Sequence, residues 1–165
     1  MAIKDALIAE LQQEAASTRK VLERVPMDKA DWTPHAKSMK LGNLANHVAE
    51  LLSWTMVTMD QDELDFATFE YKPEIPKTTE DLVKKFDGMV EKAVECLQKC
   101  DDAKFMENWT MRNGDKIFMT MPKAAVLRSF TFNHEYHHRA QLSVYLRLLD
   151  IPVPGIYGPT ADEPM

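Results

Sequence analysis

Apolar residues recur at steps of three and four along four long segments, and this period restricts the fold more than any other feature of the chain. A helix turns by about 100° per residue, so residues spaced in this way share one face. The first stripe consists of Leu7, Leu11, Ala15, Thr18, Leu22 and Val25. Comparable stripes predict helices over residues 3–25, 41–59, 78–100 and 122–150. Four amphipathic helices bury these faces when they pack together as a four-helix bundle.

The connections between these helices contain residues that stop or start helices. Pro26 follows the first helix and ends it. Ser38 is a candidate N-cap for the second helix, and Thr78 or Thr79 for the third. Residues 60–77 read as a long, proline-punctuated loop, and a loop of this length is compatible with a crossover connection between helices.

A hairpin is predicted between the third and fourth helices. Polar and apolar residues partly alternate over 105–121, around the dipeptide Asn113-Gly114, which favours a type I′ turn. We therefore predict two short strands at 107–111 and 116–120. The tail "IPVPGIYGPTADEPM" has four prolines and is expected to lie extended. The predicted fold is all-α: one domain spanning residues 1–165, a four-helix bundle with a small β-hairpin insertion before the last helix and an extended Pro-rich C-terminal tail.

Composition excludes several classes of protein. The net charge is −6, and no basic patch is visible, which argues against nucleic-acid binding. No run of apolar residues approaches the ~18 needed to cross a membrane. The first twenty residues carry charges throughout and lack the apolar core of a secretory signal. Cys96 and Cys100, four apart on a predicted helix, are poorly placed for a disulfide, so we expect a cytoplasmic protein with reduced thiols.

Three of the five histidines lie in the stretch "NHEYHHRAQ", residues 133–141. With the last helix regular, His134 is close to the centre of its apolar stripe and His138 falls about 40° away, inside it. His137 falls at the edge of the stripe. The residues predicted to face away from the interior are Arg128, Glu135, Arg139 and Arg147.

Two buried imidazoles one turn apart need polar partners. A divalent metal is one such partner, because histidines at i and i+4 of a helix can share one ion, as in H-E-x-x-H zinc sites. The alternative is that each histidine is hydrogen-bonded and purely structural. His47 on the second helix is the leading third ligand, but it lies about 90° from the centre of its own stripe, at a helix seam or exposed to solvent.

Further residues near these histidines are candidates for supporting roles. Glu50, one turn after His47, and Gln141, three after His138, could orient the imidazoles. Glu50 is also a candidate general base, or else an ordinary solvated carboxylate. Tyr145 could hydrogen-bond a substrate or simply belong to the core, and Tyr157 could fold over the mouth of the site.

Three segments together resemble the DinB-like (DinB/YfiT) superfamily: "LGNLANHVAELL", "NHEYHHRAQLSVYLRLL" and "IPVPGIYGPTADE". The resemblance covers nearly the whole chain, in order. Its most specific element is H-x3-H-R-[AG]-Q, which runs here from His134 to Gln141. An upstream helix supplies His47 in a setting that resembles L-x-x-L-x-x-H.

The resemblance implies a four-helix bundle that holds one divalent metal, most often zinc or nickel, on His47, His134 and His138. It also implies a homodimer. Characterised members include enzymes that use a low-molecular-weight thiol, so the expected function is a thiol-dependent S-transferase or a hydrolase acting on a small-molecule substrate. Three neutral imidazoles would leave the ion an open position for a water or a thiol. The alternative is a non-catalytic metal-binding stress-response protein in which the metal braces the bundle.

Overall fold

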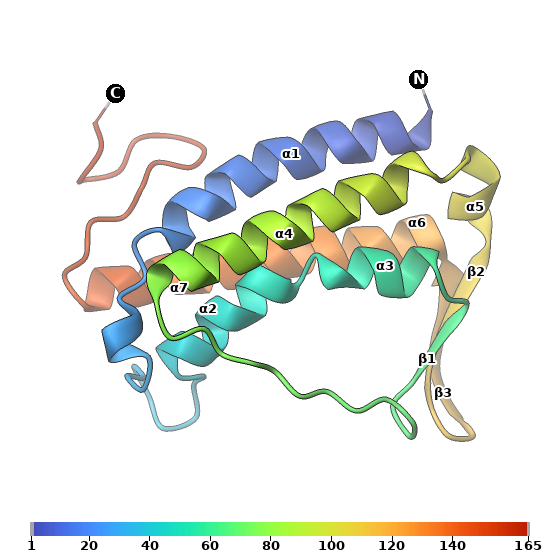
Figure 1. Cartoon of the computed structure of the whole chain (residues 1–165), viewed down its shortest axis with the longest axis horizontal. Coiled ribbons are helices and arrows are strands. Elements are labelled where there is room, and N and C mark those ends of the chain that lie inside the picture. The colour runs from blue at the N-terminus through green and yellow to red at the C-terminus, as the bar shows by residue number, and fades with distance from the viewer. Residues whose placement is uncertain (1, 165) are drawn as a thin grey trace.

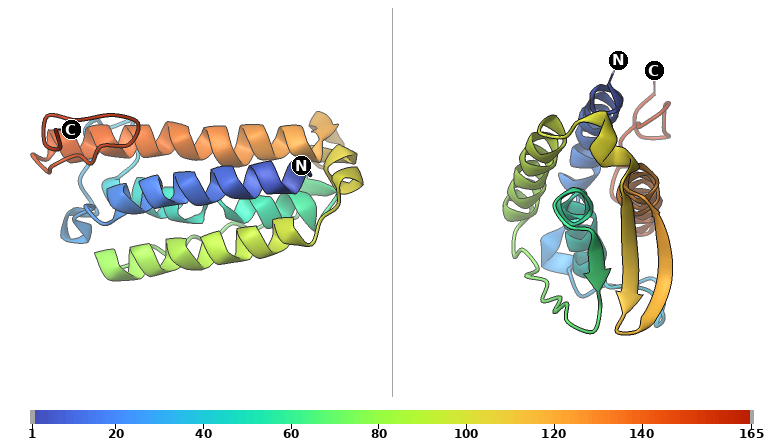
Figure 2. Two further views of the ribbon diagram at one scale, coloured as in Figure 1. Left: turned by 90° about the horizontal axis from the view of Figure 1, so that it is seen from above. Right: turned by 90° about the vertical axis from the view of Figure 1, so that its right-hand side faces the viewer.

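Long helices run side by side along the main axis of the protein, and a small three-stranded sheet closes one end (Figures 1 and 2). The computed structural model describes residues 2–164. The long helices lie where the apolar stripes predict them. Their bounds are α1 Ile3–Leu22, α2 Leu41–Glu50, α3 Ser53–Met59, α4 Thr79–Gln98 and α7 Asn133–Leu148. Short helical turns η1 (Met27–Lys29) and α5 (Asp102–Met106) occupy two of the connections.

The predicted caps have different outcomes. Thr78 caps α4, since its hydroxyl accepts a hydrogen bond from the Asp81 backbone N–H at 3.1 Å. The prediction for Ser38 is wrong. Helix α2 begins after Lys40, which has no side-chain cap, and the backbone N–H of Leu41 instead donates to the carbonyl of Trp32. A tertiary backbone contact thus replaces the local cap.

The predicted continuous helix over 41–59 is interrupted at Leu51 and Leu52, which divide α2 from α3. Here the backbone tightens, because the N–H groups of Trp54 and Thr55 donate to carbonyls three residues back rather than four. Both leucines are buried, as they would be in a continuous helix, so the apolar pattern of the sequence does not reveal the break. The interruption redirects α3 toward the sheet end of the molecule (Figure 1).

The predicted hairpin is confirmed, but the sheet has a third strand. Strand β2 (Asn108–Asn113) pairs antiparallel with β3 (Lys116–Pro122), and β1 (Glu63–Asp65) pairs parallel with β2. Strand β1 lies inside the segment 60–77, which was predicted to be entirely loop. With three residues and one buried side chain, Leu64, it is too short to produce a periodic signal.

The turn of the hairpin is displaced by one residue from the predicted position. Asn113 pairs with Lys116, so the two loop residues are Gly114 and Asp115. Gly114 has φ of +56°, whereas Asp115 is not among the residues with positive φ. A type I′ turn requires positive φ at both loop positions, so the predicted turn type is wrong.

The last helical stretch is not regular, contrary to the prediction for residues 122–150. It begins as α6 (Lys123–Val126), continues as the π-helical segment η2 (Leu127–Phe132) and ends as α7. A π turn holds an extra residue, which rotates everything that follows relative to a regular helix. The buried face of α7 consists of Glu135, His138, Arg139, Leu142, Tyr145 and Leu146. Its centre lies about 80° from His134, and Leu148 is 56% exposed.

Residues 151–164 contain no helix or strand. They turn back beside the ends of α1 and α7 (Figure 1). Val153 and Ile156 pack against the main core, and Arg24 of the first interhelical turn donates to the carbonyl of Pro152 at 3.0 Å.

The start of α2 depends on a close approach that only glycine permits. A Cβ at Gly42 would lie 2.7 Å from the Cβ of Ala30, and the Gly42 N–H donates to the Ala30 carbonyl. We expect Gly42→Ala to lower the free energy of unfolding by about 1–3 kcal/mol through overpacking. Gly88→Ala in α4 is the matched control, because its Cβ would meet nothing within 4 Å. That substitution should stabilise by about 0.5–1 kcal/mol. Urea denaturation measures both, and equal effects of the two would contradict the prediction.

Candidate metal centre

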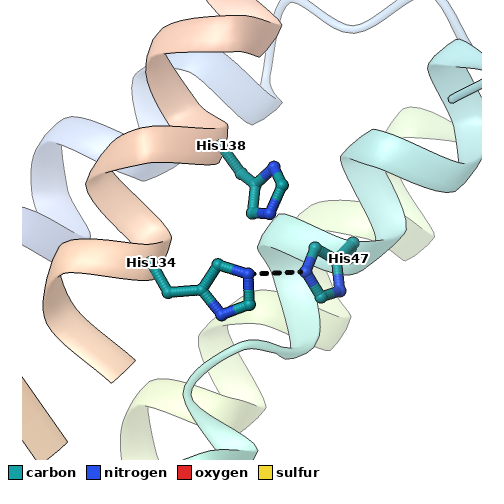
Figure 3. Close-up of side chains that lie close together, drawn as sticks. All are labelled: His47, His134 and His138. Carbon is teal, nitrogen blue, oxygen red and sulfur yellow. Dashed lines mark hydrogen bonds between the residues drawn. The ribbon is translucent and has the colours of Figure 1, made fainter. Parts of the chain in front are cut away.

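Three histidines from two helices point toward one another (Figure 3). His47 comes from α2, and His134 and His138 lie one turn apart on α7. One ring nitrogen of each lies within 4.8 Å of the others. These are the three histidines that the sequence singled out. Among the residues described, no other group of three or more histidine, cysteine or acidic side chains satisfies the same test.

The spacing of the nitrogens fits a shared cation. The Nε2 atoms of His47 and His134 are 3.4 Å apart. Two imidazole nitrogens bound to one tetrahedral ion at the usual distance lie about 3.3 Å apart. The ring centroids of the three imidazoles are separated by 4.6–5.1 Å. The rings therefore need no large movement to coordinate an ion between them.

A hydrogen bond sets the orientation of His138. Its Nδ1 lies 2.7 Å from Oε1 of Gln141. With the amide oxygen at this contact, Nδ1 carries the proton and donates, which leaves the lone pair on Nε2. The predicted orienting role of Gln141 is consistent with this contact.

His134 is held differently. Its Nδ1 is buried and has no hydrogen-bond partner of normal geometry within residues 2–164. The nearby carbonyl of Phe130, in the π-helical segment, nevertheless opposes the fall in the pKa of this ring. The π-helical segment thus places a carbonyl next to the ring of the first histidine of α7.

All three imidazoles are kept neutral by their surroundings. Burial lowers the pKa of His47 to about 4, with smaller contributions from His138 and His134. Burial also lowers the pKa of His134 and of His138, although the hydrogen bond to Gln141 works in the opposite direction on His138. A neutral imidazole has the free lone pair that a metal requires.

These shifts predict how the stability of the metal-free protein depends on pH. The pKa of His47 is about 4 in the folded protein and 6.5 in the unfolded chain. Between these values the unfolded chain binds a proton that the folded protein excludes, so the contribution of His47 to stability should fall as the pH is lowered from about 6.5 toward 4. Above pH 6.5 this residue contributes no slope. Thermal melts from pH 8 to 4.5 should show a smaller loss for His47→Gln than for the unsubstituted protein, and parallel curves would contradict the assignment.

Pockets flank the histidine cluster. One, of about 290 Å³, has His47 in its wall together with parts of α2, α3, β1 and the following loop. The other, of about 270 Å³, is bounded by His134 and His137 and by residues of the π-helical segment. His137 lies beside His138 but is outside the three-histidine group.

Glu50 lies in the wall of the larger pocket and is not a solvated carboxylate. Its side chain is 14% exposed and forms an ion pair with Lys85 of α4 at 2.9 Å. It also accepts hydrogen bonds from Asn46 at 3.1 Å and from the hydroxyl of Tyr71. Asn46 lies four residues before Glu50 on α2, whereas Lys85 and Tyr71, to which the sequence did not point, join Glu50 only through tertiary contacts.

The two tyrosines suggested from the sequence have other partners. Tyr145 packs edge-on against Trp32, and its hydroxyl donates to the carbonyl of Met39 at 3.2 Å. Tyr157 does not fold over the histidines. It lies on the α1 side of α7, where its hydroxyl donates to Glu14 at 2.6 Å.

The prediction that Glu135 and Arg139 face away from the interior is also wrong. They are 2% and 3% exposed and lie between α7 and α1. Arg139 pairs with Glu14 at 2.7 Å, and Glu135 accepts a hydrogen bond from Thr18 at 2.8 Å. Helix α7 is thus covered on two sides, by histidine contacts toward α2 and by this buried polar network toward α1. Burial raises the pKa of Glu135 to about 7, against the opposing effects of Thr18 and Arg139.

Among the described residues, no helix combines the length and the apolar character needed to span a bilayer. Cys96 and Cys100 are both free thiols, as predicted.

Comparison with known proteins agrees with this architecture. The chain is 24% identical over 159 residues to the uncharacterized protein YrdA of Bacillus subtilis (strain 168), covering 96% of this chain and 90% of that one. A crystal structure of a DinB-like protein from Bacillus cereus ATCC 10987 matches with a TM-score of 0.73 at 21% identity, covering 94% of this chain and 98% of the other. The DinB-like protein YjoA from Bacillus subtilis matches with a TM-score of 0.70 at 18% identity, covering 92% and 96%.

These structural likenesses concern the fold. The sequence model of the DinB family matches residues 1–164, which is nearly the whole chain. The chain therefore belongs to the DinB family.

Proposed function

We propose that this protein is a divalent-metal-dependent enzyme that acts on a small molecule at the site formed by His47, His134 and His138. The observation that carries the proposal is that three neutral imidazoles converge beside a pocket that contains a carboxylate, Glu50. The proposal treats the four helical stretches as a four-helix bundle, in which metal sites are built from side chains on facing helices. The reaction that best fits is S-transfer from a low-molecular-weight thiol, or hydrolysis.

The donor set supports this reading. Three nitrogen donors suit zinc or nickel, and three protein ligands with further positions open are typical of catalytic rather than structural zinc sites. When bound, the ion would act as a Lewis acid toward an oxygen or sulfur atom in an open position. The orientation of His138 by Gln141 is the kind of outer hydrogen bond that tunes such ligands.

Within the pocket, we assign Glu50 the role of proton acceptor. Its carboxylate is held by Lys85 and Asn46, which limits its movement while leaving it in the pocket wall. A base held in this way is already oriented when a substrate binds. Tyr145 has no part in this assignment, because its hydroxyl is engaged with the carbonyl of Met39. We also expect the protein to act as a homodimer.

The proposal is tested by metal analysis and turnover. Protein purified without a metal-affinity tag should contain about one divalent ion per chain. His47→Ala, His134→Ala and His138→Ala should each lose it, while the control His137→Ala, which removes a neighbouring imidazole outside the group, should retain it. Unchanged metal content in the three variants would eliminate the site.

A panel of thiol-conjugation and hydrolysis reactions, run with and without chelator, then distinguishes a metal-dependent enzyme from a protein in which the metal only stabilises the fold. An enzyme should lose turnover on chelation while the fold persists. Unfolding on chelation, with no turnover under any condition, would favour the alternative in which the metal only braces the helices.

Glu50→Gln should lower turnover about 10²–10⁴-fold with metal content unchanged, as expected for loss of a general base.

A further inference from the structure

The larger pocket has a strongly aromatic character. The wall residues are His47, Glu50, Leu51, Ser53, Trp54, Val57, Leu64, Phe66, Phe69 and Tyr71. They come from α2, α3, β1 and the loop that runs from β1 to α4, beneath α2 and α3 in the view of Figure 1. A pocket of about 290 Å³ is at the small end for ligand sites, which suits one or two fused rings.

Two of the rings in the pocket wall, Trp54 and Phe66, pack against other aromatic side chains. Trp54 stacks on Phe130 with centroids 5.6 Å apart and meets Trp109 edge-on at 6.2 Å. Phe66 lies 6.4 Å from Phe118 of β3. An aromatic wall held in this way can stack against a flat ligand without first being ordered.

The loop that carries Phe66, Phe69 and Tyr71 is tied to α2 and α4 by hydrogen bonds. The hydroxyl of Tyr71 donates to Glu50, and Lys85 donates to the carbonyl of Glu74 at 3.1 Å as well as to Glu50. The same carboxylate that faces the pocket therefore holds the loop against α2 and α4. Phe69 and Phe66 remain 44% and 42% exposed, so this side of the pocket is open to solvent.

Charge restricts what the pocket can accept. The wall includes no lysine or arginine, and its one carboxylate is already paired with Lys85. In the metal-free protein, an anionic ligand in this pocket would lose its hydration without gaining a cation from the wall, which is costly. A neutral ring would instead gain stacking and apolar contact.

We propose that this pocket binds the neutral aromatic part of the substrate, with Phe66, Phe69 and Tyr71 as the residues that select for it. The inference rests on the proposed function, since it places the substrate beside the metal ligand His47. It specifies that the part of the substrate inside this pocket is a small, uncharged aromatic ring, so any anionic group of the substrate must lie outside the pocket.

The test compares two probes of similar size, 2-naphthol and 2-naphthoate at pH 7, by isothermal titration calorimetry in the presence of chelator. We expect 2-naphthol to bind at least about tenfold more tightly, a difference of about 1.4 kcal/mol. Phe69→Ala should weaken its binding by about three- to tenfold through loss of ring contact. Ile117→Ala is the control, because Ile117 is 63% exposed on β3 and is not part of the pocket wall.

Equal binding of the two probes, absence of 2-naphthol binding, or an unchanged affinity in Phe69→Ala would each overturn the inference. Because binding is measured without metal, the two proposals fail separately. Loss of the metal assignment with 2-naphthol still bound would affect only the proposed function. A metal-loaded protein that binds no naphthol would affect only the inference drawn here.

Discussion

Replacement of Arg139 by alanine is expected to lower the free energy of unfolding by about 3–5 kcal/mol, the usual cost of removing one partner from a buried ion pair. The guanidinium is 3% exposed and pairs with Glu14 at 2.7 Å. It also donates to the carbonyl of Glu14 and to the hydroxyl of Thr18, each at 3.2 Å, and to the hydroxyl of Tyr157. Its removal would leave the Glu14 carboxylate buried without a cation. Chemical denaturation monitored by circular dichroism measures the loss.

Arg19→Ala provides the matched control for this experiment. Arg19 pairs with Asp87 at 3.1 Å and with Glu23, but its side chain is 44% exposed. Exposed ion pairs contribute little, so the control should lose less than about 1 kcal/mol. If Arg139→Ala lost no more than Arg19→Ala, the buried network would not be what holds α7 against α1.

A saturating divalent metal is expected to raise the free energy of unfolding of the unsubstituted protein by about 4 kcal/mol at a concentration a thousandfold above the dissociation constant. The reason is that the folded protein brings three imidazole nitrogens within 4.8 Å, whereas the unfolded chain separates His47 from the α7 pair by more than eighty residues of chain. His138→Ala should abolish this stabilisation. Differential scanning calorimetry with and without zinc or nickel measures it.

Gln141→Leu gives an intermediate case that distinguishes ligation from orientation. Gln141 contacts Nδ1 of His138 rather than the face turned toward His47 and His134. Loss of such an outer hydrogen bond usually weakens metal binding about 10–100-fold. The metal-dependent rise in stability should therefore persist but require a higher concentration. Complete loss in Gln141→Leu, or full retention in His138→Ala, would show that the ligands are assigned incorrectly.

Much of the fold could be predicted from local pattern. The amphipathic stripes located the long helices, because side chains that share a helical face repeat every three or four residues. Thr78 was one of two candidate caps for the third helix and is the one that caps it, and the hairpin was placed between the third and fourth helices. Two of the failures were local as well. The one-residue shift of the turn at Gly114 and the missed strand β1 both involve segments too short to carry a period.

The candidate site divides in the same way. His134 and His138 could be recognised as a pair from their spacing, because residues four apart on a helix lie one above the other. The π-helical segment before them sets the rotation of α7, and the period of a regular helix, on which the prediction was based, gives no sign of it. For that reason Glu135 and Arg139 were assigned to the wrong face. Whether His47 lies at a seam or is exposed could not be decided from the pattern of its own helix, because a seam exists only where another helix packs alongside.

By itself, the sequence located the long helical stretches, showed which histidines could act together and indicated the family through the motif that includes His47, His134 and His138. Only the tertiary structure decided the break between α2 and α3, the parallel pairing of β1 and the buried pairing of Arg139 with Glu14. It also decided that Glu50 is tied to Lys85 and Tyr71 beside an aromatic pocket. The physical reason is the range of the interactions. Helical periodicity depends on residues three and four apart in the sequence, whereas these contacts join residues that meet only when the helices pack.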